Sequence, residues 1–191
     1  RSLARRVAAP AVERAGRSAK SDEPDSRDAP ALRREVHQAT GMILIQLDVT
    51  ADGTNLASGA GDALVEDVFV RGSGDDGLAL WSRRQADRDI TYRRNTIIAP
   101  SLANGIAVYG GRDITLERNL VADVLTQGGG YHLGARFNAR PFQGDVTLRD
   151  NTAVRASGGD PNWNHGVGAF WTYALDVPIE ARIRVSGLRL I

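Results

Sequence analysis

The sequence predicts an all-β protein, a right-handed parallel β-helix (solenoid) of about five rungs that follows a disordered N-terminal tail. Three observations point to this fold. From residue 41 onward, short β-branched stretches recur between glycine, asparagine and aspartate residues. Four of these segments can be aligned at intervals of 24 to 32 residues, and no stretch of helical periodicity separates them. A repeat of this length built from short strands is typical of a solenoid, and the lack of intervening helices argues against a βαβ fold.

The first 40 residues have a different composition. Only Gly16 of the 21 glycines lies before residue 41, and no aromatic residue precedes Phe69. The segment carries nine basic and six acidic side chains and is rich in alanine, serine and proline. Such a segment buries too little apolar surface to offset the entropy lost on ordering. We therefore predict a disordered or weakly helical tail over 1–40 and the β-helix over 41–191.

The aligned segments share one order of features: a strand, an Asp or Asn, a second strand, a polar turn and a glycine-containing strand. They cover 64–80, 90–108, 114–133 and 146–170, after a partial copy at 44–56. The polar residues aligned in them are Asp67, Asn95, Asn119 and Asn151. Asparagine tolerates the left-handed turn, and its amide can bond to the next rung. We interpret these residues as a structural ladder inside the solenoid.

The overall composition excludes several classes of function. The formal net charge is +1, so no global basic field favours nucleic-acid binding. The absence of cysteine excludes disulfide scaffolds and thiol catalysis. No apolar run approaches the roughly 20 residues of a membrane span, and no signal peptide is visible. We therefore expect neither nucleic acid nor membrane as a partner.

The sharpest local motif is the aspartate pair Asp75-Asp76 between two glycines. The tripeptide that ends in Gly77 aligns with Ala51-Asp52-Gly53 one rung earlier and with Ala103-Asn104-Gly105 one rung later. Asp52 and Asp76 are therefore expected to lie above one another. Mutual repulsion among three nearby carboxylates raises the pKa of at least one of them, as a general acid requires.

The spacing of these carboxylates suits one kind of chemistry. Inverting glycosidases need carboxyl groups ~6.5–9.5 Å apart, and side chains one rung apart can reach that range. Adjacent residues of a strand point to opposite faces. We therefore expect the chain to bend at the flanking glycines, so that Asp75 and Asp76 can both face one cleft.

Longer motifs resemble glycoside hydrolase family 87, which contains the α-1,3-glucanases (mutanases) and the mycodextranases. They are ADGTNL, GDDGLALWS, LANGIAVYGGRD, GGGYHLGARFNARP and DPNWNHGVGAFWTYALD. The resemblance runs from about residue 44 to 191. It implies a right-handed β-helix catalytic domain, inverting endo-hydrolysis of an α-glucan polysaccharide, and an extracellular location. Family members have many more rungs before the first catalytic aspartate, so we expect 41–191 to be a partial catalytic domain.

The resemblance also implies roles for individual residues. The three catalytic aspartates of the family fall on Asp52, Asp75 and Asp76. By analogy with related inverting β-helix hydrolases, Asp75 is the expected general acid. Asp52 and Asp76 would hold and deprotonate the attacking water.

Other residues are candidates for substrate binding, because aromatic rings stack on sugars and polar tips bond to their hydroxyls. They are Asn55, Trp81, Asn104, Tyr109, His132, Arg136, Trp163 and His165. Trp171 and Tyr173 lie in a continuous apolar strand and are predicted to belong to the core.

No cofactor is expected, although three close aspartates could hold a structural Ca²⁺. Two alternative functions remain open. The chain could be a non-catalytic carbohydrate-binding or structural β-helix remnant, or a β-helix hydrolase of the dextranase type. Pectin is disfavoured because no Arg/Lys pair accompanies the aspartates. The choice between α-1,3-glucan and nigeran, endo against exo action and the oligomeric state are left open by the sequence.

Overall fold

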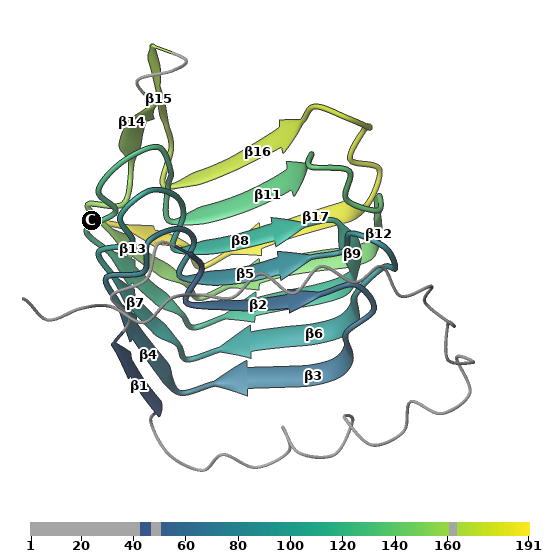
Figure 1. Cartoon of the computed structure of the whole chain (residues 1–191), viewed down its shortest axis with the longest axis horizontal. Coiled ribbons are helices and arrows are strands. Elements are labelled where there is room, and N and C mark those ends of the chain that lie inside the picture. Colours follow the sequence, from purple (N-terminus) through teal and green to yellow (C-terminus); the bar gives the residue numbers. More distant parts are fainter. Residues whose placement is uncertain (1–42, 47–50, 161–163) are drawn as a thin grey trace, which may run out of the picture. The chain divides into compact units, whose positions relative to one another are not determined.

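The structure is a computed structural model that describes residues 43–46, 51–160 and 164–191 (Figure 1). The predicted tail at 1–40 and the candidate Trp163 lie outside the described residues. The described part contains strands and turns without any helix, so it offers no helix that could cross a membrane.

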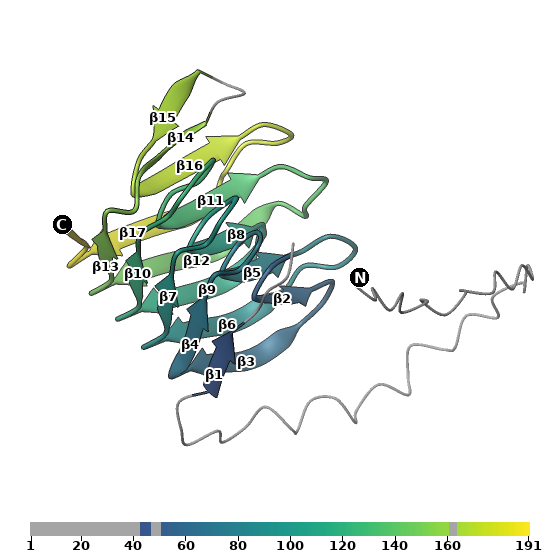
Figure 2. The same cartoon turned by 60° about the vertical axis from the view of Figure 1, so that its left-hand side comes forward.

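Three parallel sheets form the sides of the molecule (Figures 1 and 2). The first has the order β1 (Ile43–Gln46), β4 (Val68–Arg71), β7 (Thr96–Ile98), β10 (Leu120–Ala122), β13 (Thr152–Val154) and β18 (Arg189–Leu190). The second has β2 (Thr54–Ala57), β5 (Leu78–Trp81), β8 (Ile106–Tyr109), β11 (Tyr131–Ala135) and β16 (Phe170–Ala174). The third has β3 (Gly61–Glu66), β6 (Arg88–Arg93), β9 (Gly111–Glu117), β12 (Phe142–Arg149) and β17 (Arg182–Ser186).

After β1 the chain visits the second, third and first sheets in the same order at every turn. This arrangement confirms the predicted all-β parallel β-helix. One insertion departs from the pattern: the antiparallel hairpin of β14 (Gly158–Asp160) and β15 (His165–Val167), which projects from the last turn before β16 (Figure 1).

Inward-facing apolar side chains stack in columns, one from each turn. Fully buried examples are Leu78, Ile106 and Tyr131 on the second sheet, Ile90, Ile114 and Val146 on the third, and Val70, Ile97 and Val121 on the first. Because each rung covers the apolar face of the next, the core is continuous along the axis of the solenoid.

The corner between the third and first sheets contains the asparagine ladder. The backbone N–H and Nδ2 of Asn95 donate to Asn119 Oδ1 at 2.9 and 3.0 Å, and those of Asn119 donate to Asn151 Oδ1 at the same distances. Each Nδ2 also donates to a backbone carbonyl, such as that of Tyr92. The predicted ladder is confirmed for these three residues, which are 1% exposed.

Asp67 is not part of this ladder, and its alignment with Asn95 is wrong by one position. The backbone N–H of Val68 donates to Asn95 Oδ1, so Val68 occupies the ladder position. Asp67 lies instead beside Arg94, whose Nε donates to it at 2.8 Å. Both have positive φ angles, 56° and 54°. Aspartate suits a left-handed corner as asparagine does, so residue type alone could not fix the register there.

We predict that Asn119→Ala destabilises the β-helix by about 2–4 kcal/mol, because it removes several buried hydrogen bonds and leaves the backbone N–H of Asn95 without its acceptor. Urea unfolding measures the loss. Gln85→Ala also removes an amide side chain, but at an exposed bend residue, and should alter stability by less than about 0.5 kcal/mol. Equal unfolding midpoints for the two variants would contradict a structural role for the ladder.

Candidate active site

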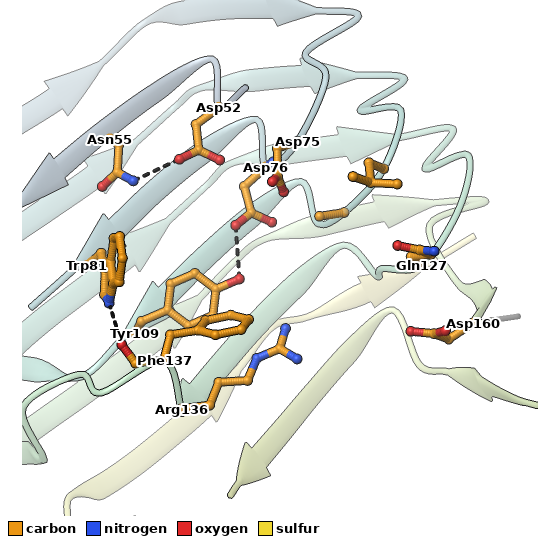
Figure 3. A pocket seen from close by; sticks show the side chains of 12 residues that line it. Asp52, Asn55, Asp75, Asp76, Trp81, Tyr109, Gln127, Arg136, Phe137 and Asp160 are labelled. Atoms are coloured by element: carbon orange, nitrogen blue, oxygen red, sulfur yellow. Dashed lines mark hydrogen bonds between the residues drawn. The ribbon is translucent and has the colours of Figure 1, made fainter. Parts of the chain in front are cut away.

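Asp52, Asp75 and Asp76 line one open pocket of about 440 Å³ (Figure 3). All three lie in connections that lead from the first sheet to the second, just before β2 and β5. Trp81 and Tyr109, at the ends of β5 and β8, line the same pocket. The connections between sheets therefore supply the acidic groups, and the strand ends supply the aromatic rings.

The strand register brings the acidic residues into one column. Thr54 pairs with Leu78, and Leu78 pairs with Ile106. Just before these pairs, the Gly53 N–H donates to the Asp76 carbonyl at 2.9 Å, and the Gly77 N–H donates to the Asn104 carbonyl at 2.9 Å. Asp52, Asp76 and Asn104 thus occupy equivalent positions in successive turns, as the aligned tripeptides predicted.

The aspartate pair lies in a bend before β5 and not in a strand. The side-chain alternation of a strand does not apply there, so Asp75 and Asp76 both reach the pocket. Gly77 is required at the end of this bend. A Cβ at this position would collide with the Ile97 side chain and lie 2.6 Å from the Gly105 carbonyl oxygen.

Asp76 is the most deeply placed of the three carboxylates, at 3% exposure. Its Oδ1 accepts hydrogen bonds from Asn104 N at 2.7 Å and Asn104 Nδ2 at 2.8 Å, and its Oδ2 accepts one from Tyr109 Oη at 3.0 Å. Burial raises the pKa of Asp76 to about 7, helped by the charges of Asp75 and Asp52, while the bonds from Asn104 oppose the rise.

Asp52 lies half-buried one turn away, where Asn55 Nδ2 donates to its Oδ2 at 2.7 Å. Burial raises the pKa of Asp52, the Asn55 bond counteracts this, and the Asp75 charge adds to the rise. One oxygen from each of the three carboxylates lies within 4.8 Å of the others, so their nearest oxygens are closer together than the ~6.5–9.5 Å expected from the sequence. Groups this close titrate as a coupled set and can share a proton or a water molecule.

The same oxygens are close enough to share a cation, and among the described residues they form the candidate group for one. Asp76, however, already accepts three hydrogen bonds from the protein. The binding of a structural Ca²⁺ by the three aspartates stays a prediction.

The pocket wall combines aromatic rings and one guanidinium. Trp81 and Tyr109 occupy paired positions in β5 and β8, as expected, and Trp81 Nε1 donates to the Phe137 carbonyl at 3.2 Å. The Arg136 guanidinium carbon lies 4.4 Å from the Phe137 ring centroid and 5.7 Å from that of Tyr109. The wall thus offers apolar ring surface beside a fixed positive charge.

Two substrate-binding candidates lie behind the pocket instead of lining it. Asn104 is 1% exposed, and its side chain is bonded to Asp76. His132 is fully buried, stacks on Trp171 at a centroid distance of 3.6 Å and places Nδ1 3.3 Å from the Trp171 carbonyl oxygen. Burial lowers the pKa of His132 to about 3, with a further contribution from Arg136, so the imidazole stays neutral.

The remaining candidates lie elsewhere on the described surface. His165 is exposed in β15 and borders a neighbouring hollow together with Trp171 and Tyr173. The assignment of Trp171 and Tyr173 to the core is wrong. Their partners in β11 are His132 and Gly134, on the outer face of the sheet, whereas the inward-facing partners of β11 are Tyr131 and Leu133.

Sequence reasoning missed several residues that line the pocket. They are Leu102, Ala103, Gln127, Phe137 and Asp160. All of these except Asp160 come from connections whose lengths vary between turns, and Asp160 ends β14 of the inserted hairpin. Their side chains carry no periodic signal, although the loop that places Phe137 is adjacent in sequence to the candidate Arg136.

These features define a β-helix domain with a carboxylate-based candidate active site. Residues 43–177 match the family model described as α-1,3-glucanase catalytic domain D2, and the chain belongs to this family, which places it in glycoside hydrolase family 87. No match was found among curated proteins.

Two solved structures resemble the chain. One is the catalytic unit of a thermostable family 87 α-1,3-glucanase from Streptomyces thermodiastaticus strain HF3-3, with 41% identity and a TM-score of 0.70 over 75% of this chain. The other is the catalytic domain of a family 87 α-1,3-glucanase variant in complex with tetrasaccharides, with 22% identity and a TM-score of 0.65 over 77% of this chain, a likeness of fold. The chain spans 28% and 34% of their respective lengths.

We predict that Asp76→Asn changes how stability depends on pH. Between about pH 4 and the pKa of about 7, the folded protein keeps a proton on Asp76 that the unfolded chain releases. Wild-type stability therefore contains a contribution that is present below pH 4 and lost as the pH rises through 7. The variant has no carboxyl proton at this position. Its free energy of unfolding, relative to that of the wild type, should therefore increase by up to about 4 kcal/mol between pH 4 and pH 8.

Urea unfolding at a series of pH values measures this difference. Asp89→Asn makes the same substitution at an exposed residue of β6 and serves as the matched control. If the variant and the wild type differ in unfolding free energy by the same amount at pH 8 as at pH 4, the burial of Asp76 does not control its ionisation.

Proposed function

We propose that this domain hydrolyses α-1,3-glucosidic bonds of α-glucans with inversion, using Asp52, Asp75 and Asp76. The observation that carries the proposal is the convergence of three carboxylates with different surroundings in one open pocket. Carboxyl groups held in different environments can divide the roles of acid and base between them.

In this proposal Asp75 is the general acid, an assignment that rests on the family resemblance, because among the three aspartates the carboxyl groups with a raised pKa are those of Asp76 and Asp52. It is partly exposed in the bend before β5, where its carboxyl group can reach a substrate that lies across the pocket. It donates its proton to the glycosidic oxygen as the bond between that oxygen and the anomeric carbon breaks. Loss of the proton leaves Asp75 as a carboxylate, to be reprotonated from solvent before the next turnover.

Asp52 and Asp76 form the base in the proposed mechanism. A water held between them would lose a proton to one carboxylate while its oxygen bonds to the anomeric carbon on the face opposite the leaving group. The acceptor must be ionised. Because the pKa of Asp76 is raised to about 7, the rate should increase with pH up to that region if Asp76 takes the proton.

The substrate class is inferred from the relatives and from the pocket wall. Both solved relatives are α-1,3-glucanases. The Trp81 and Phe137 rings offer surfaces on which glucosyl rings can stack, and the Arg136 guanidinium offers donors for sugar hydroxyls. Endo action on a polysaccharide outside the cell belongs to the same proposal and rests on the family resemblance.

We predict that Asp75→Asn lowers hydrolysis by at least about 100-fold, because a correctly placed general acid contributes about 10²–10⁴-fold to the rate. Release of reducing ends from insoluble α-1,3-glucan measures the rate, and NMR of the first products shows their anomeric form. Inversion at an α-linkage yields the β-anomer first. Thermal unfolding of the variant checks that the fold is retained, and Asp89→Asn serves again as the control.

An unchanged rate in Asp75→Asn, or an α-anomer as the first product, would reject this mechanism. Sedimentation of the protein with α-1,3-glucan without any release of reducing ends would instead favour the non-catalytic carbohydrate-binding alternative. A parallel assay on dextran and on nigeran distinguishes the remaining substrates.

A further inference from the structure

Both oxygens of the Asp76 carboxylate accept hydrogen bonds from the next turn of the β-helix, and Figure 3 shows the one from Tyr109. Asn104 donates to Oδ1 through its backbone N–H and its side-chain amide, and Tyr109 donates to Oδ2 through its hydroxyl. Donors on both oxygens fix the plane of a carboxylate as well as its position. This one neighbouring turn thus sets how Asp76 faces Asp52.

Asn104 is itself held in a single orientation. Its Oδ1 accepts from the Gly129 N–H at 3.0 Å and from Trp171 Nε1 at 2.9 Å. Two N–H donors therefore face the carbonyl end of the amide, and a carboxylate faces the NH₂ end. Rotation of the amide by 180° would set donors against donors and an acceptor against an acceptor, so the Nδ2 donor stays directed at Asp76.

The ring of Tyr109 is fixed in a similar way. It is 7% exposed and packs edge-on against the rings of His132 and Phe137, with centroid distances of 5.5 and 5.2 Å. A phenol held on two sides has little freedom to turn its hydroxyl away from Asp76. The sugar-stacking role expected for Tyr109 does not require this buried bond, so the bond needs its own explanation.

The charged and titratable groups around Asp76 come from several elements. They are Asp52 before β2, Asp75 in the same bend, Tyr109 on β8, His132 on β11, Arg136 after β11, and Asp160 at the end of β14. Two of these carboxylates, Asp75 and Asp52, disfavour ionisation of Asp76, as does burial. The hydrogen bonds from Asn104 and Tyr109 favour its ionised form.

We propose that Tyr109 and Asn104 are positioning residues of the reaction, which orient the Asp76 carboxylate toward Asp52 and favour its ionised form, the form that acts as a base. Trp171 contributes by holding the Asn104 amide. The inference rests on the proposed function for its consequence in catalysis, but the effect on Asp76 itself can be measured without any substrate.

Three variants test the proposal. Tyr109→Phe keeps the packed ring and removes one donor to Asp76. Asn104→Asp keeps an acceptor for Gly129 and Trp171 but replaces the donor with a carboxylate. Tyr131→Phe is the matched control, because its buried hydroxyl bonds to the backbone carbonyls of Asn119 and Thr152 and not to a carboxylate.

Two readouts are followed in each protein. The first is the titration of the Asp76 carboxyl carbon by NMR in protein labelled with ¹³C-aspartate, with the resonance assigned through its loss in Asp76→Asn. The second is the pH profile of hydrolysis of α-1,3-glucan. In Tyr109→Phe the titration midpoint should rise by about one to two pH units, because a hydrogen bond to a charged group is lost. The acidic limb of the rate profile should move with it.

Asn104→Asp should raise the midpoint as well, and Tyr131→Phe should leave both readouts as in wild type. A midpoint in Tyr109→Phe and Asn104→Asp that equals that of wild type overturns the proposal. So does a raised midpoint with an unmoved acidic limb, because the bonds would then have no part in the reaction. If the midpoint rises in the variants but the wild-type protein hydrolyses no α-1,3-glucan at any pH, the effect of Tyr109 and Asn104 on Asp76 is supported. In that case it is the proposed function that is rejected.

Discussion

The parallel register between successive turns is the constraint on which the rest of this structure depends. The connections differ in length from turn to turn, yet the backbone bonds from Gly53 to Asp76 and from Gly77 to Asn104 keep equivalent residues above one another. The same register stacks the asparagine ladder at one corner and the acidic residues near another. A shift of one residue in a single strand would break both columns together.

Asp76 shows how burial and hydrogen bonding compete at a candidate catalytic carboxylate. Burial disfavours its charge, and donors from Asn104 and Tyr109 restore part of the lost solvation. Asp87 shows a similar balance: it is buried, its pKa is raised by burial, and it accepts bonds from backbone N–H groups and from Ser82. A perturbed carboxylate thus marks an active site only where it meets a pocket and further acidic groups.

The fold and the acidic cluster could be predicted from the sequence because both are periodic. Repeats of strands and glycines predict the solenoid, and the recurring tripeptides place Asp52 and Asp76 in one column. The position of Asp67 could not be predicted, since two neighbouring corner residues both suit an asparagine or an aspartate. Trp171 was misassigned because an apolar strand at the last turn does not reveal which of its faces is covered.

The sequence by itself determined the class of fold, the family motifs and the three aspartates, because these follow from local patterns repeated at regular intervals. Only the tertiary structure decided which polar groups face the pocket and which lie behind it. Asn104 and His132 are polar residues beside the acidic column, yet both are buried. Phe137 and Gln127 join the pocket wall from connections between turns, and Asp160 joins it from the end of β14. Their positions depend on how neighbouring turns pack, which no periodicity in the chain encodes.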